Sequence, residues 1–131
     1  MANFNKLPMG QALLNNNNLT VKSIFFGLKK QLVYVPTGSP VKVIKKNYHS
    51  DAIAPLRRII ENDSKGLASA VKAFKSQTKP LGNLELDICV SEDKNFVALQ
   101  LLQFGEEYAY HPITEVAFYE GDQAHLVSTI L

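Results

Sequence analysis

The chain has 131 residues, a hydrophobic fraction of 46%, one cysteine and a formal net charge of +2. This length and apolar content suit one domain whose core needs no disulfide or metal staple. The single cysteine, Cys89, excludes an internal disulfide, so we expect an intracellular, cytoplasmic protein rather than a secreted disulfide-built domain. No apolar run approaches the roughly 18 residues of a membrane span. Residues 1–10 lack the continuous apolar segment of a signal peptide, so no membrane partner is expected.

Charge is divided unevenly along the chain. Residues 1–80 contain thirteen Lys or Arg and three acids, which gives +10, whereas residues 81–131 contain one lysine and nine acids, which gives −8. Such asymmetry is typical of a polyanion-binding face, or of two charged faces that meet partners or each other.

Asparagine is concentrated in residues 1–19, which contain six, four of them in the tract 15–18. Polar amide tracts bury little apolar surface, so we expect a flexible arm here, followed by a single domain over residues 20–131. Four apolar residues could still hold parts of this arm against the body or a neighbouring subunit: Phe4, Leu7, Leu13 and Leu14.

Residues 20–31 allow two interpretations. Apolar residues at positions 21, 24, 25 and 28 follow helical spacing, and Thr20 is a suitable N-cap. This pattern favours a helix with its lysines toward solvent. The run Ile24–Phe26 is β-prone and Gly27 weakens a helix, so a strand stays open as the alternative.

Two β-rich runs, 32–35 and 41–46, flank a loop over residues 36–40. The loop has the length of a hairpin connection and contains a glycine, so we expect a hairpin that extends the main sheet or pairs with its edge. Alternation in the second run places Lys42 and Lys46 on one face, and a basic edge discourages unwanted strand pairing.

Two helices are expected next, over residues 51–62 and 64–79. Each has an apolar stripe, and Pro55 fits the first turn of the first helix. At about 100° per residue, the lysines of the second helix fall beside its buried face within an arc of roughly 80°. These lysines are Lys65, Lys72, Lys75 and Lys79, and no acid lies between Ser64 and Pro80.

The C-terminal part is predicted to be an antiparallel meander of four strands. Residues 84–90 alternate in polarity and predict a half-buried strand. The run Phe96–Phe104 has no charge, glycine or proline, so we expect it to be the central strand, buried on both faces. A third strand over residues 108–119 is broken at Pro112, and a turn at 120–123 leads to a fourth over 125–131.

The predicted fold is therefore α+β, with this meander, the N-terminal hairpin and two or three helices packed on the sheet. The helices at 51–62 and 64–79 cover one face of the central strand. The other face needs the N-terminal helix, a second sheet or a partner chain. For that reason we expect self-association, as a homo-oligomer, or another protein partner.

No catalytic residue, cofactor or metal site is predicted. The triad residue types at positions 49–51 are neighbours in sequence and cannot take up triad geometry, so a helix cap explains them better. Glu85 and Asp87 point to the same side of their strand as Cys89. Their charges would raise the pKa of its thiol, which favours an inert cysteine.

Histidines and acids elsewhere form no specific motif. The possible ligands His111, His125, Cys89 and Glu115 lack every common metal-ligand spacing. Glutamates at 106–107 and the acids at 120 and 122 lie at strand ends, as glycosidase carboxylates do, but they fit solvated turns better. The loop 36–40 lacks the Gly-Lys-Ser/Thr of a phosphate-binding loop.

The basic residues suggest the two function hypotheses. We favour a small non-enzymatic interaction protein, an adaptor, assembly factor or inhibitor that acts through its charged faces and an exposed sheet face. The alternative is nucleic-acid binding, because solvated helix faces usually mix both charge signs and this one does not. The proposed polyanion-binding residues are Lys42, Lys46, Arg57, Arg58, Lys65, Lys72, Lys75 and Lys79, with Tyr34 and Tyr48 to stack on bases.

Overall fold

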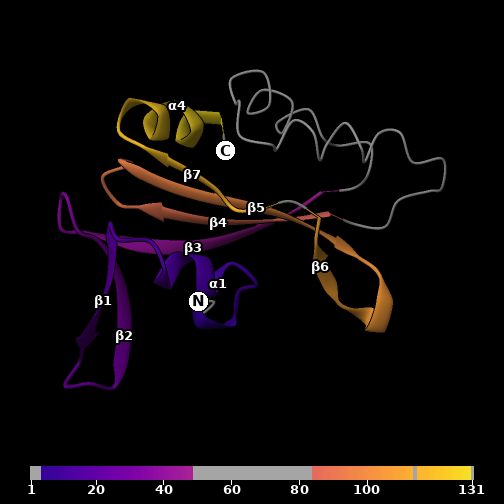
Figure 1. The fold of residues 1–131 in the computed structure, drawn as a ribbon, viewed down its shortest axis with the longest axis horizontal. Coiled ribbons are helices and arrows are strands. Elements are labelled where there is room, and N and C mark those ends of the chain that lie inside the picture. Colours follow the sequence, from indigo (N-terminus) through magenta and orange to yellow (C-terminus); the bar gives the residue numbers. More distant parts are fainter. Residues whose placement is uncertain (1–3, 49–83, 114, 131) are drawn as a thin grey trace.

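A computed structural model describes residues 4–48, 84–113 and 115–130, with Tyr48 and Ile130 described by backbone alone. This part of the chain is mainly an antiparallel sheet of seven strands with few helices, which confirms the α+β class in coarse form with fewer helices than predicted. The predicted helices 51–62 and 64–79 lie outside the described ranges. In chain order the elements are η1 (Phe4–Lys6), α1 (Gly10–Leu14), β1 (Leu19–Ile24), β2 (Lys29–Tyr34), β3 (Ser39–Tyr48), β4 (Leu84–Ser91), β5 (Phe96–Phe104), η2 (Glu106–Tyr108), β6 (Tyr110–Pro112), β7 (Ala117–Glu120) and α4 (Asp122–Ile130) (Figure 1).

The strands follow one another across the sheet in the order β1-β2-β3-β4-β5-β6, each antiparallel to its neighbour. The predicted hairpin of residues 32–46 is confirmed as β2 and β3, and it extends the sheet because β3 pairs with β4 along its length. β6 and β7 share one edge of β5, so the strand is interrupted as predicted, although the break follows Pro112, the last residue of β6, rather than falling at it.

The central strand β5 faces two cores. Val97, Leu99 and Leu101 belong to a cluster that includes residues of α4, whereas Phe96 and Ala98 belong to a cluster on the opposite face. Every β5 side chain from Phe96 to Leu102 is buried. The prediction of a central strand buried on both faces is therefore confirmed.

The N-terminal segment packs on the face opposite α4 (Figure 1). Phe4, Leu7, Met9 and Leu13 are buried in the second cluster, whereas Leu14 is exposed. The chain's own N-terminus thus fills a face that we expected to need the 20–31 helix or a partner, and this face gives no reason to expect an oligomer. The flexibility of residues 1–19 and the domain boundary at residue 20 stay predictions.

A glycine makes this N-terminal packing possible. A Cβ atom at Gly10 would lie 2.9 Å from the carbonyl oxygen of Phe4, which is too close for any other residue without a backbone shift. Glycine therefore lets helix α1 begin directly against η1.

The helix predicted for residues 20–31 is wrong. β1 and β2 pair in register from Leu19 opposite Tyr34 to Ile24 opposite Lys29. Helical spacing is present in this segment, but the pairing of β2 with β3, the burial of Leu32 and the packing of the partly buried Val21 on the second cluster outweigh it. The glycine that weakened the helix, Gly27, lies in the turn between the strands at φ +83°.

The strand predicted for residues 125–131 is also wrong, because Asp122–Ile130 form helix α4. Ala124 and Val127 are buried three residues apart, which is the spacing of one helix face. Gly121 has a φ of +63° and lets the chain turn from β7 into the helix. Asp122 places a negative charge in the first turn, where the helix dipole favours it.

Strand β4 is more deeply buried than its alternation predicts. All eight of its residues are buried, including Glu85 and Asp87. These two side chains share a face with Cys89, which belongs to the second cluster. The prediction of a half-buried β4 is wrong because the face that carries Glu85, Asp87 and Cys89 packs on the second cluster and not against solvent.

Candidate functional site

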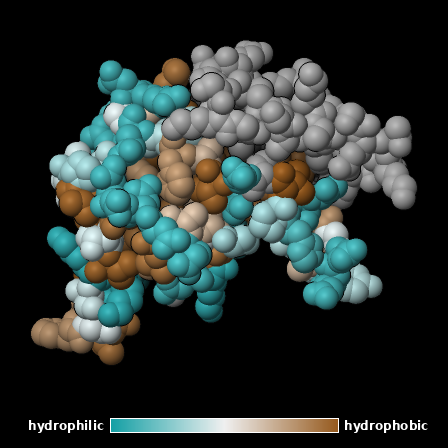
Figure 2. Space-filling model, viewed as in Figure 1, coloured by the Kyte–Doolittle hydropathy of each residue, from teal (hydrophilic) through white to brown (hydrophobic). Residues whose placement is uncertain are grey.

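The β1–β2 hairpin projects from the body of the protein and ends in three exposed apolar side chains (Figure 1). Phe25, Phe26 and Leu28, here called the apolar tip, are 67%, 108% and 88% exposed. Figure 2 shows this apolar end of the hairpin at lower left. Single exposed apolar residues are common, but three within four residues at the end of a projection mark a candidate binding surface.

The tip has an unusual backbone. Phe25, Phe26 and Gly27 have φ values of 52°, 56° and 83°, and the amide of Leu28 donates to the carbonyl oxygen of Phe25 at 3.1 Å. A left-handed conformation costs a residue other than glycine roughly 1–2 kcal/mol. Hairpin turns of this kind prefer Asn, Asp or Gly. Two phenylalanines therefore occupy positions where folding alone favours small polar residues.

Three exposed lysines, here called the lysine collar, surround the base of the tip: Lys22, Lys29 and Lys30. They lie on the three residue pairs nearest the turn, with Lys29 opposite Ile24, Lys30 opposite Ser23 and Lys22 opposite Gln31. Successive pairs face opposite sides of a hairpin, so Lys22 and Lys29 lie on one face and Lys30 on the other. The Lys30 ammonium also donates to the Ser23 hydroxyl at 2.8 Å.

Acids lie at the opposite end of the hairpin. Residues 1–50 contain no Asp or Glu. Glu120 Oε1 accepts hydrogen bonds from Asn18 Nδ2 at 2.7 Å and Tyr34 Oη at 2.8 Å, beside the first residue pair of β1 and β2. At about 3.3 Å per residue, Glu120 is roughly 17 Å from the last pair before the tip. The hairpin is thus basic and apolar at its free end and acidic where it joins the body.

The polyanion-binding residues predicted from sequence are only partly within the described ranges. Lys42 and Lys46 lie on the same face of β3, opposite Val90 and Leu86. Lys42 is exposed and Lys46 is half-buried. The other six lie outside the described residues: Arg57, Arg58, Lys65, Lys72, Lys75 and Lys79.

The predicted stacking residue Tyr34 is in the core. It is 6% exposed, its ring stacks on Phe96 at a centroid distance of 5.3 Å, and its hydroxyl is bonded to Glu120. Tyr34 therefore has no ring face to offer to a base. Tyr48 ends β3, and its side chain is not among the described ones.

A pair of buried carboxyl groups lies on β4. Burial, a hydrogen bond to Glu85 and the Glu85 charge raise the pKa of Asp87 to about 7, although the Lys45 charge lowers it. Among the described residues no donor reaches either carboxylate oxygen of Asp87, so a bond between the two carboxyl groups requires a proton on one of them. Lys45 Nζ lies 3.8 Å from Glu85 Oε2. With Asp87 fully buried, the pair is closed to a substrate and affects stability instead.

Cys89 is fully buried, and its sulfur lies 3.8 Å from that of Met9. Burial and the Asp87 charge raise the pKa of its thiol to about 12. Burial is the larger cause, and of the two carboxylates expected to raise this pKa, Glu85 and Asp87, only Asp87 contributes. A thiol with a raised pKa lacks the ionised form that a nucleophile needs.

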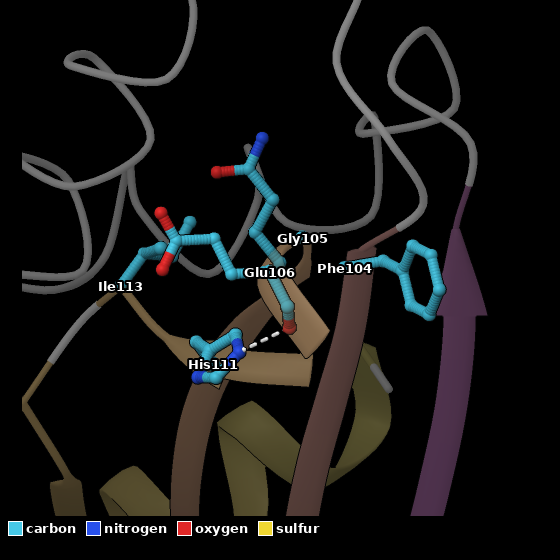
Figure 3. Close-up of a pocket in the computed structure, with 6 residues that line it drawn as sticks. Phe104, Gly105, Glu106, His111 and Ile113 are labelled. Carbon is cyan, nitrogen blue, oxygen red and sulfur yellow. Dashed lines mark hydrogen bonds between the residues drawn. The ribbon is translucent and has the colours of Figure 1, made fainter. Parts of the chain in front are cut away.

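An open hollow of about 380 Å³ lies at the end of β5 (Figure 3). It is lined by Gln103, Phe104, Gly105, Glu106, His111 and Ile113. His111 Nε2 donates to the carbonyl oxygen of Glu106 at 2.8 Å, whereas His125 in α4 has its Nε2 2.8 Å from Oδ1 of Asn95 in the β4–β5 turn. Within ranges 4–48, 84–113 and 115–130, no three of His, Cys, Asp and Glu gather as metal ligands.

Sequence reasoning missed the apolar tip because it assigned Phe25 and Leu28 to the apolar stripe of a helix. The usable signal was symmetry about the turn. Two six-residue segments, 19–24 and 29–34, flank four residues that contain Gly27, which is a hairpin pattern.

No family model, curated protein or solved structure matches the chain. Within the part of the chain that the structure describes, no helix combines the length and apolar content needed to cross a membrane. Function is therefore inferred from the geometry of the hairpin and the chemistry of its side chains.

Proposed function

We propose that the protein is a small non-enzymatic interaction protein that docks through its β1–β2 hairpin. The observation that carries this proposal is the full exposure of Phe26 at the end of the hairpin, between the exposed Phe25 and Leu28. Burial of a Phe or Leu side chain contributes about 1.5–3 kcal/mol. A partner that covers the apolar tip would therefore gain several kcal/mol of binding free energy before the losses of association are subtracted.

The backbone at the tip supports a binding role. Left-handed Phe25 and Phe26 weaken the fold, and such conformations cluster where a segment serves recognition. Their rings pack on no core cluster of the described residues. These side chains therefore make little contribution to the stability of the protein and are available to a partner.

The lysine collar supports an anionic partner. Lys22, Lys29 and Lys30 are exposed, and only Lys30 has a side-chain hydrogen bond to a neighbour on the hairpin. Fixed charges of one sign around a contact point steer association and raise its rate. We therefore propose a partner surface that combines negative charge with an apolar interior.

Buried titratable groups favour binding over catalysis. A catalytic acid or base has to reach its substrate. The described groups with clearly raised pKa values are Tyr34, Asp87 and Cys89, and all three are buried. Nucleic-acid binding through residues 42–79 remains the alternative, with the exposed Lys42 as its best-placed described residue.

Photocrosslinking from the tip tests the docking proposal. A benzophenone amino acid replaces Phe26, and a matched variant carries it at Tyr108, which is also aromatic, 92% exposed and at positive φ. Both variants are irradiated in native extract that includes membranes. Position 26 should give discrete crosslinked adducts, and the same adducts should be missing from position 108. Identical adducts from both positions, or none from position 26, would show that the tip is not the docking element.

A further inference from the structure

We infer that the hairpin docks end-on into the surface of an anionic lipid bilayer. This inference rests on the proposed function and names the class of its partner. It replaces the expectation of no membrane partner, which rested on the lack of a spanning run, because here only the apolar tip enters the boundary between headgroups and acyl chains. Interfacial apolar groups insert about 5–10 Å, a depth that a four-residue turn reaches.

The shape of the tip fits a fluid, planar partner. Phe25, Phe26 and Leu28 are each at least two-thirds exposed at the end of a projecting hairpin, so neighbouring residues cover little of any of them (Figure 1). A convex tip of this kind needs a partner that flows around it or a pocket matched to it. Large apolar side chains at a bilayer surface gain burial on every side without a matched pocket.

The lysine collar fits the same plane. Lys29, Lys30 and Lys22 lie on consecutive pairs, which span about 7 Å along the hairpin, and they point to both of its faces. Ammonium groups on both faces reach one headgroup layer only when the hairpin stands end-on to it. A groove that received the hairpin sideways would contact one face only. It would meet either Lys22 with Lys29, or Lys30 alone.

The position of the acids fixes the orientation. Glu120 lies at the base of the hairpin, bonded to Asn18 and Tyr34. Its distance from the last pair before the tip, roughly 17 Å, exceeds the screening length of about 8 Å at physiological salt. An anionic surface at the tip therefore attracts the collar and leaves Glu120 largely unaffected, whereas a side-on approach brings acids close to it.

Nucleic acid is a weaker candidate for this site. Single-stranded nucleic acids bind in basic grooves that follow the backbone, with aromatic platforms for successive bases. The hairpin offers a convex end instead of a groove, and one of its three exposed apolar side chains, Leu28, is aliphatic and cannot stack on a base. Lipid is therefore the partner that uses all three apolar side chains and all three lysines together.

Tryptophan fluorescence tests insertion directly, since the chain contains no tryptophan. Phe26→Trp in the full-length protein should shift its emission to shorter wavelength with phosphatidylcholine vesicles that contain phosphatidylserine. Brominated lipids should quench it, and vesicles of phosphatidylcholine alone should leave it unchanged. Tyr108→Trp is the matched reporter and should not respond. A Phe26→Trp protein that floats with the vesicles while its indole ring stays in water would overturn the inference.

Charge variants test the collar by vesicle flotation. Lys22→Gln, Lys29→Gln and Lys30→Gln should each weaken partitioning about fivefold, and together on the order of a hundredfold. The exposed Lys94→Gln, at the β4–β5 turn, should change it less than about twofold. Phe26→Ser with Leu28→Ser should remove binding, while circular dichroism shows an unchanged fold. Equal partitioning of the collar variant and the wild type would contradict the inference.

The two proposals fail separately. If vesicles do not bind and position 26 crosslinks to a protein or a nucleic acid, the lipid inference falls and docking through the tip stands. If vesicles do not bind and position 26 gives no adduct, both fall. Lipid adducts at position 26 together with binding that depends on phosphatidylserine support both.

Discussion

The hydroxyl of Tyr34 donates a 2.8 Å hydrogen bond to Glu120, although 86 residues separate them. Asn18, the residue before β1, donates to the same carboxylate oxygen, so Glu120 fastens β2 and the start of β1 to the end of β7. The Tyr34 ring also stacks on Phe96 at the start of β5. The base of the hairpin is therefore fixed to the central strand and its neighbour, while its tip is free.

Removal of the Tyr34 hydroxyl should loosen this base. We expect Tyr34→Phe to lower the free energy of unfolding by about 1.5–3 kcal/mol, because the bond has a charged acceptor. Tyr108→Phe is the control, since Tyr108 is 92% exposed, and should change stability by less than about 0.5 kcal/mol. Urea denaturation of both variants at pH 7 measures the difference. Equal stabilities would show that the bond contributes nothing.

The Tyr34–Glu120 bond should also limit alkaline stability. Burial, the hydrogen bond to Glu120 and the charges of Glu120 and Asp93 raise the pKa of Tyr34 from 10.0 to about 12. The folded state thus keeps a proton that the unfolded state loses, and stability should fall as pH rises from about 10 to 12. In Tyr34→Phe this decline should be weaker. Denaturation midpoints across that range provide the test.

The buried carboxyl pair should make the protein less stable as acidity decreases. The pKa of Asp87 is raised from 3.8 to about 7, so its stabilising proton is fully present below pH 3.8 and lost as pH rises through 7. We expect Asp87→Asn to be more stable than the wild type at pH 8, by on the order of a few kcal/mol. The exposed Glu92→Gln should show no such gain. A destabilised Asp87→Asn at pH 8 would contradict this account.

Adjacent leucines of α1 should differ sharply in their contribution to stability. Leu13 is fully buried and Leu14 is 51% exposed. Leu13→Ala should lower the free energy of unfolding by about 2–5 kcal/mol through a cavity in the second core. Leu14→Ala should change it by less than about 1 kcal/mol. Calorimetry of the pair checks whether the N-terminal segment belongs to the cooperative unit, and a small effect of Leu13→Ala would exclude it.

The apolar tip should be a site where stability can be gained. Phe26 is left-handed and fully exposed, so Phe26→Asn should raise the free energy of unfolding by about 0.5–1 kcal/mol. The same variant should lose crosslinked or lipid-bound partners. Chemical denaturation measures the gain, and a less stable Phe26→Asn would mean that the ring has a structural role.

The sequence predicted the structure correctly in segments where a single pattern was present. Phe96–Phe104 has neither charge nor a breaker, and it is β5 in full. Glycine and proline between two β-rich runs marked the β2–β3 turn. In both places local propensity and tertiary environment agree, which is the condition under which periodicity predicts structure.

Prediction failed where two periods fitted the same residues. Residues 20–31 satisfy helical spacing, but pairing with neighbouring strands decides in favour of β1 and β2. Asp122–Ile130 contains β-branched residues, yet burial of Ala124 and Val127 on one face makes it α4. The first of these errors hid the candidate site. The predicted helix buried Phe25 and Leu28, whereas the turn between β1 and β2 exposes them.

The N-terminal packing also constrains the order of folding. Met9 and Cys89 touch across a separation of 80 residues, and the same cluster needs Phe96 and Ala98. Ribosomal synthesis therefore releases the first residues of this core long before the strands that receive them. Long-range contacts close slowly because the intervening chain loses entropy when its ends meet. We expect the second core to be the last part of the protein to form, and nascent chains to hold an unburied N-terminus until β5 emerges.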